Sequence, residues 1–176
     1  QALMSERLSD DSVTTTVRIS IMEAMQGSGL MTVPPLWTAP LLAQLTTEDP
    51  DLLAVAVTAV YKLSDAKPDS AFVEQLNDIA ADTGLPDQVR LQALVAVPGG
   101  QRIIDAAALQ FLGDSLSVDQ PVGIRSLAVD VLHSTPLDSA AMQTVAPAIA
   151  STGPMALRRL VELFAGTSDT QVGMQL

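Results

Sequence analysis

The stretch Pro86-Asp-Gln-Val-Arg-Leu-Gln-Ala-Leu-Val-Ala-Val97 decides the fold, because versions of it recur along the chain at nearly constant spacing. Each version places apolar residues at helical spacing after a turn that contains Pro, Gly or Asp. Aligned on the residue before the arginine, the copies are 36, 36, 35 and 33 residues apart: Val17-Arg18, Leu53-Ala54, Val89-Arg90, Ile124-Arg125 and Leu157-Arg158. This period predicts a solenoid of stacked helix pairs.

The composition supports an all-α fold. Of the 176 residues, 48% are hydrophobic, which is ample for a core, and only 3% are aromatic. Ala, Leu and Val dominate, and this favours closely packed helices over a sandwich or barrel, which would need aromatic and β-branched strands. We therefore expect an α-α superhelix, a right-handed solenoid.

The helical pattern is interrupted by turns but by no long linker, so we expect a single repeat domain over residues 1–176. Four complete helix pairs and partial pairs at both ends account for the chain. Neither end has the polar outer face of a capping repeat, and we expect a fragment of a longer array. The helices are expected near residues 1–8, 14–26, 34–45, 51–63, 70–82, 86–97, 102–116, 122–133, 138–150 and 154–166.

Two prolines fall inside expected helices. Pro40 should bend or delay its helix, and Pro147 should kink or shorten the last turn of another, because proline lacks an amide N–H and clashes with the preceding turn.

Charge and chemistry exclude several classes of function. The formal net charge is −11, with 9 basic and 20 acidic residues, so a phosphate backbone would be repelled and nucleic acid is not expected as a partner. The longest apolar run, Leu52–Val57, extends at most to Val60 and is too short to span a membrane. The chain has no cysteine, so disulfides and thiolate metal sites are excluded.

No catalytic, cofactor-binding or metal-binding residues are predicted. His133 is the only histidine, and its neighbours Asp130 and Ser134 do not form the oriented arrangement that nucleophilic catalysis needs. One histidine with scattered carboxylates lacks the ligands of a zinc site, and no calcium-binding loop is present. Gly27-Ser-Gly29 and Pro98-Gly-Gly100 are expected to be turns, since neither leads to a phosphate-binding motif.

The repeated motif resembles the HEAT repeat family. A turn with Pro or Asp is followed by an apolar residue, an arginine, and a small or apolar residue three positions later: Arg18 with Ile21, Arg90 with Ala93, Arg125 with Ala128 and Arg158 with Val161. The resemblance covers the whole chain, although Ala54 replaces the arginine in one copy. Tetratricopeptide repeats would carry recurring aromatic residues, and ankyrin's signature is approached only once, at Thr135–Ala140.

The HEAT resemblance implies that the motif helix lines the inner side of the superhelix. It also implies a ladder in which a turn aspartate pairs with the arginine of a neighbouring repeat. An alternative use of the arginines, here together with Arg159, is an inner-face stripe that binds an acidic partner segment; we favour the ladder. The residues concerned are Arg18, Arg90, Arg125, Arg158, Asp49, Asp87 and Asp119.

The segment Leu157–Leu176 is similar to the HEAT region of large secreted planctomycete-type bacterial proteins. In those proteins a sorbosone-dehydrogenase-like propeller precedes the repeats and a cytochrome c domain follows them. The resemblance implies a spacer or docking module of an extracytoplasmic oxidoreductase, with the propeller and the haem domain outside this chain.

Two functional hypotheses follow. The preferred one is a non-catalytic α-solenoid scaffold that binds a protein or the neighbouring domains of its own chain. The alternative is the oxidoreductase spacer. Neither hypothesis places an enzymatic site or a cofactor within this chain.

Overall fold

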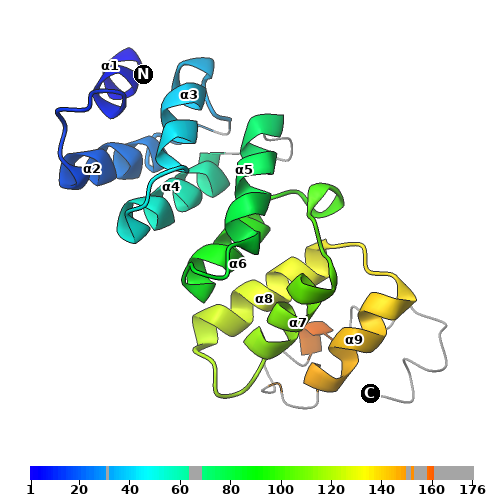
Figure 1. Ribbon diagram of the computed structural model, residues 1–176. Helices are drawn as coiled ribbons and strands as arrows, with labels where there is room; N and C mark the ends of the chain where they lie inside the picture. Colours follow the sequence, from blue (N-terminus) through cyan, green and yellow to red (C-terminus); the bar gives the residue numbers. More distant parts are fainter. Residues whose placement is uncertain (31, 64–68, 150–151, 153–157, 161–176) are drawn as a thin grey trace. The chain divides into compact units, whose positions relative to one another are not determined.

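The computed structural model describes residues 1–30, 32–63, 69–149, 152 and 158–160, and these residues form helices without any strand (Figure 1). The fold class expected from the sequence is therefore confirmed as all-α. The helices are α1 (Ala2–Leu8), α2 (Thr15–Gln26), α3 (Pro35–Gln44), α4 (Pro50–Leu63), α5 (Ser70–Ala81), α6 (Asp87–Ala96), the 3-10 turn η1 (Gly99–Gln101), α7 (Ala106–Ser115), α8 (Val122–Ser134) and α9 (Ser139–Ile149).

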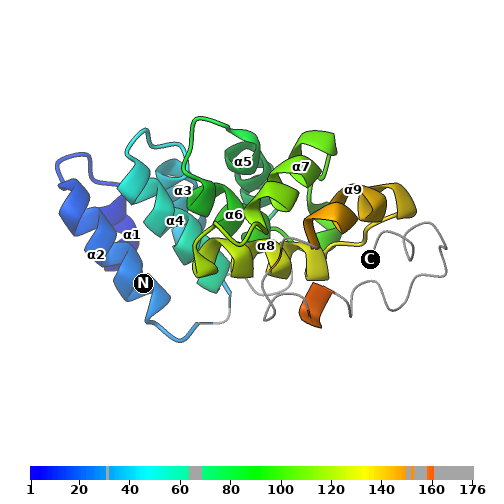
Figure 2. The same cartoon turned by 90° about the horizontal axis from the view of Figure 1, so that it is seen from below.

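The chain divides into two compact units, Gln1–Pro98 and Gly99–Leu176. In the first unit, α2 packs on α4 and α4 on α6, while α1 packs on α3 and α3 on α5 (Figures 1 and 2). Even-numbered helices thus form one layer and odd-numbered helices the other. In the second unit, α7 packs on both α8 and α9. A single domain over residues 1–176 stays a prediction.

The middle helix of the first unit is buried on several sides, as its nearly continuous apolar sequence predicts. Ala56, Val57, Ala59 and Val60 of α4 are fully buried, because α4 lies between α2 and α6 and also contacts α3. Residues of this size let neighbouring helices approach closely, and their burial removes apolar surface from water.

The helix that contains Pro40 begins at Pro35 and runs without a break as α3, so it is not delayed; a bend at Pro40 stays a prediction. Proline cannot donate an N–H to the carbonyl four residues earlier, which here belongs to Leu36. The hydroxyl of Ser5 in α1 donates to this carbonyl oxygen instead, over 2.6 Å. A contact from the neighbouring helix thus satisfies the group that the proline leaves unpaired.

The helix expected at residues 102–116 begins only at Ala106, so the prediction was wrong over its first turn. Asp105 is the N-cap of α7, and its carboxylate accepts a hydrogen bond of 2.8 Å from the amide of Ala108. Residues 102–104 are not helical, and Arg102 reaches the end of α8 instead. The other expected helices agree with the structure to within about two residues; for 154–166, only residues 158–160 are described, and these are helical.

Candidate functional site

Arg18 in α2 is largely buried and ties several backbone segments together. Its guanidinium donates to the carbonyl oxygens of Asp10 and Val13, both at 3.2 Å, and to the side-chain oxygen of Gln44 at 3.4 Å. It also lies 3.6 Å from the exposed carboxylate of Asp11. Gln44 belongs to α3 of the following helix pair and is 3% exposed. Arg18 therefore links two neighbouring repeats through a buried amide.

Arg90, at the equivalent position in α6, makes a similar contact within its own helix pair. Its side chain is 12% exposed, and its Nε donates to the carbonyl oxygen of Ala80, in the last turn of α5, over 3.0 Å. The carboxylate of Asp87, three residues earlier in α6, lies 3.9 Å away. A cation at a helix C-terminus satisfies an unpaired carbonyl and opposes the negative end of the helix dipole.

The other residues of the predicted ladder occupy different settings. Asp49 caps α4 through hydrogen bonds from the amides of Asp51 (3.0 Å) and Leu52 (3.2 Å). Asp119 is exposed in the turn between α7 and α8. Arg125 is half-buried and its Nε has no hydrogen-bond partner in the described part of the chain, and Arg158 is exposed. An aspartate-to-arginine ladder between repeats stays a prediction.

One ion pair between neighbouring copies was missed by the sequence reasoning. Arg159 Nη2 lies 2.7 Å from Asp130 Oδ1 of α8. Both side chains are about half exposed, so we expect the pair to contribute little to stability. Its two residues occupy positions other than those of the repeated motif, and the motif therefore offered no signal for it.

In the Gly99–Leu176 unit, another arginine, the half-buried Arg102, caps the C-terminus of α8. Its Nη1 donates to the carbonyl of Val131 (3.1 Å) and to the hydroxyls of Ser134 (2.7 Å) and Thr135 (2.8 Å). Burial lowers the pKa of Arg102 to about 10, which leaves it charged at neutral pH. Gly99 approaches the same helix end so closely that an added Cβ would overlap the carbonyl oxygen of Ser134.

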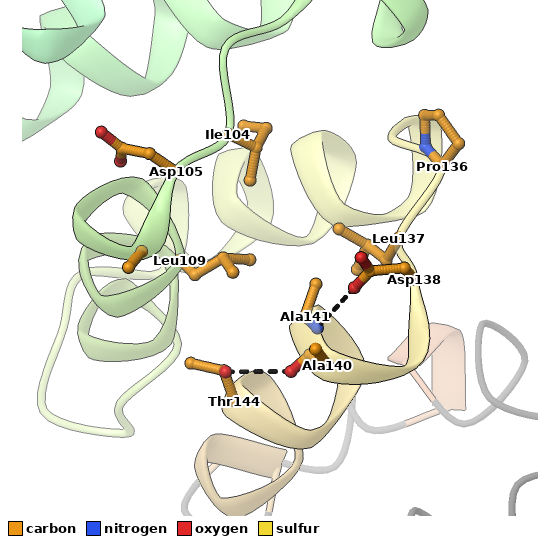
Figure 3. Close-up of a pocket in the computed structure, with 10 residues that line it drawn as sticks. Ile104, Asp105, Leu109, Pro136, Leu137, Asp138, Ala140, Ala141 and Thr144 are labelled. Atoms are coloured by element: carbon orange, nitrogen blue, oxygen red, sulfur yellow. Dashed lines mark hydrogen bonds between the residues drawn. The ribbon is translucent and has the colours of Figure 1, made fainter.

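The described residues of this unit form a groove between α7 and α9, which we call the α7–α9 groove. One hollow of about 400 Å³ lies at the N-terminal ends of the two helices, where Ile104, Leu109 and Leu137 point into the space between them (Figure 3). A second hollow of about 450 Å³ lies further along, and both share Leu109 and Thr144 as lining residues. The two hollows are therefore parts of one groove.

This groove was not among the features predicted from the sequence. Small residues on both helices leave it open, and the available signal was their recurrence on facing helices: Ala106 and Gly113 on α7, and Ala140, Ala141 and Ala148 on α9. No single motif marks such a surface, because its depth depends on how closely two helices pack.

Two kinds of feature are absent from the described residues. No group of three His, Cys, Asp or Glu side chains in this part of the chain is arranged to hold a metal ion. None of the helices described is both long and apolar enough to cross a membrane.

Comparison with known proteins identifies the fold. The chain matches no protein-family model, and no curated protein is significantly similar to it in sequence. A solved structure described as "Designed armadillo repeat protein YIII(Dq)4CqI" is similar to it, with a TM-score of 0.52 and 13% sequence identity over 99% of this chain and 95% of that one. The chain therefore has the fold of an armadillo/HEAT-like helical repeat, an α-solenoid.

Proposed function

We propose that this chain is a non-catalytic scaffold that mediates contacts between proteins or between neighbouring domains of a longer protein. The observation that carries the proposal is the α-solenoid fold, which exposes a large helical surface relative to its core and commonly serves recognition. The open α7–α9 groove adds a concave surface on which a partner could lie. The net charge of −11 favours a protein partner over nucleic acid.

Site-specific photo-crosslinking in cells tests this proposal. A photoreactive amino acid is placed, one position at a time, at exposed residues of both units, such as Thr144, Gln88 and Glu74. A scaffold gives crosslinks to a defined protein or domain from a contiguous set of positions. The proposal would be contradicted if no position gave a crosslink in the full-length protein.

The narrower hypothesis of an oxidoreductase spacer rests on the resemblance of Leu157–Leu176. The structure describes only residues 158–160 of this segment, and the comparisons give the hypothesis no support. An extracytoplasmic location depends on the same resemblance and stays a prediction. Sequencing the gene around this segment tests it, because a propeller upstream and a haem-binding Cys-x-x-Cys-His motif downstream are required.

A further inference from the structure

The α7–α9 groove has a wide opening and mainly apolar walls in its N-terminal part, whereas polar residues such as Gln110 and Ser117 share the lining of the second hollow. Its N-terminal part is lined by the aliphatic side chains of Ile104, Leu109 and Leu137, and α9 contributes only short side chains there, those of Ala140, Ala141 and Thr144 (Figure 3). Hollows of this volume are large enough for side chains of a bound segment. The walls therefore suit aliphatic side chains that enter from outside.

The charge around the groove is negative. Asp138 caps α9, and its carboxylate lies over the groove beside Leu137 and accepts a 2.8 Å hydrogen bond from the amide of Ala141 (Figure 3). Asp105 caps α7 from the outer side of that helix. A helix N-terminus carries only about +0.5 charge. Two full carboxylate charges therefore outweigh two N-termini, and this end attracts cations rather than anions.

The other end of the groove carries a carboxylate in an unfavourable position. Asp114 lies in the last turn of α7, where the negative end of the helix dipole disfavours an anion. Its Oδ1 accepts a 2.9 Å hydrogen bond from Gln110. Among the described residues, Asp105, Asp114 and Asp138 take part in no ion pair, and no Lys, Arg or His lines either hollow. A cation that pairs with these carboxylates must therefore come from a bound partner.

We propose that the α7–α9 groove binds a segment of a separate protein that presents aliphatic side chains flanked by Lys or Arg. The inference rests on the proposed scaffold function and adds to it the chemistry of the partner. A second copy of this chain is disfavoured as the occupant, since both copies carry a formal charge of −11 and would repel each other. The aliphatic side chains fill the hollow lined by Ile104, Leu109 and Leu137, and the basic side chains pair with Asp138 at one end of the groove and Asp114 at the other.

Selection from a random phage-displayed library of peptides about 12 residues long, against the full 176-residue chain, tests the inference. The enriched peptides should combine aliphatic residues with Lys or Arg. Their affinities are then measured by fluorescence polarisation for three variants. In D114N/D138N, asparagine at 138 keeps the helix cap while removing the charge. In T144F a ring enters the groove, and E74Q/D78N makes the same charge change on exposed positions of α5.

We expect D114N/D138N and T144F each to weaken binding about tenfold or more, and E74Q/D78N to leave it within about twofold. Binding should also weaken as salt rises above about 0.15 M. The inference is overturned if nothing is enriched, if the enriched peptides lack basic residues, if T144F binds as well as the wild type, or if E74Q/D78N loses as much as D114N/D138N. Self-association of the chain that T144F abolishes would also overturn it. In that case, photo-crosslinks to a partner from another surface of the chain would still support the scaffold function.

Discussion

Replacing Arg102 with methionine should loosen the end of α8. The substitution keeps a long apolar side chain but removes the guanidinium that donates from Nη1 to Val131, Ser134 and Thr135. It therefore separates the hydrogen bonds of Arg102 from its packing.

The expected loss in the free energy of unfolding depends on how many hydrogen bonds of Arg102 are removed and on whether their acceptors keep other partners. One nitrogen with two hydrogens makes at most two strong bonds among its three partners, and bonds from a charged donor contribute about 1.5–3 kcal/mol each. Desolvation of the guanidinium, visible in its lowered pKa, offsets part of this. The Thr135 hydroxyl still donates to the carbonyl of Val131 over 2.7 Å, so these two buried groups remain hydrogen-bonded to each other. We expect a net loss of about 1–2 kcal/mol in the free energy of unfolding.

Urea denaturation, monitored by circular dichroism, measures the change in the stability of the whole chain. Native-state hydrogen exchange measures the change in local stability at the end of α8. Since stacked repeats can unfold in parts, exchange at the amide of Thr135, which donates to Leu132 in the last turn of α8, is the more specific readout. The control is Arg7→Met, which removes an exposed arginine from a 3.6 Å ion pair with Asp10 and should cost about 0.5 kcal/mol or less.

Equal stability of R102M and R7M, together with unchanged exchange at the amide of Thr135, would contradict this role of Arg102. Arg102→Lys gives an additional check. Lysine keeps the charge but is more strongly hydrated and lacks the planar fork, so it should recover only part of the lost stability.

Three further predictions concern single positions. Gly99→Ala should cost about 1–3 kcal/mol because its Cβ would overlap the α8 backbone, whereas Gly100→Ala, with open space around the added atom, should melt within a few degrees of the wild type. Hydrogen bonds from the hydroxyl and amide of Ser12 hold the pKa of Asp10 below 3.8, so the folded state favours the carboxylate; this contribution is present above pH 3.8 and is lost as the pH falls. Ser12→Ala should raise this pKa in an NMR titration, and an unchanged value would contradict the assignment. Asp105→Ala should cost about 1 kcal/mol in urea denaturation and Asp105→Asn almost nothing; equal losses would exclude a capping role.

The regular part of the fold could be predicted because it depends on local spacing. The apolar periodicity and the flanking Pro, Gly and Asp residues located α4, α5 and α8 to within a residue or two. The start of α7 was missed because Asp105 was taken as an interior residue, although an aspartate before an alanine run is a capping signal.

The non-local features could not be read from the sequence. The bond from Ser5 to Leu36 joins residues 31 positions apart and depends on how α1 packs on α3. The α7–α9 groove likewise requires the distance between two helices, which no local pattern encodes. The sequence pattern singled out the repeated arginine, but it did not reveal that in two copies the arginine donates to backbone carbonyls. Arg90 donates to that of Ala80, and Arg18 donates to those of Asp10 and Val13.

This use of arginine also accounts for the copy that lacks it. Arg90 donates to a carbonyl in the last turn of α5, the outer helix that precedes its own. In the copy with Ala54, the preceding outer helix is α3, and a carbonyl in its last turn, that of Ala43, accepts a 2.9 Å hydrogen bond from the hydroxyl of Thr46. A local side chain thus supplies a donor at the end of α3, so arginine is not required there. In these two copies, residues of different types, Arg90 and Thr46, thus supply a side-chain donor to a carbonyl in the last turn of the outer helix.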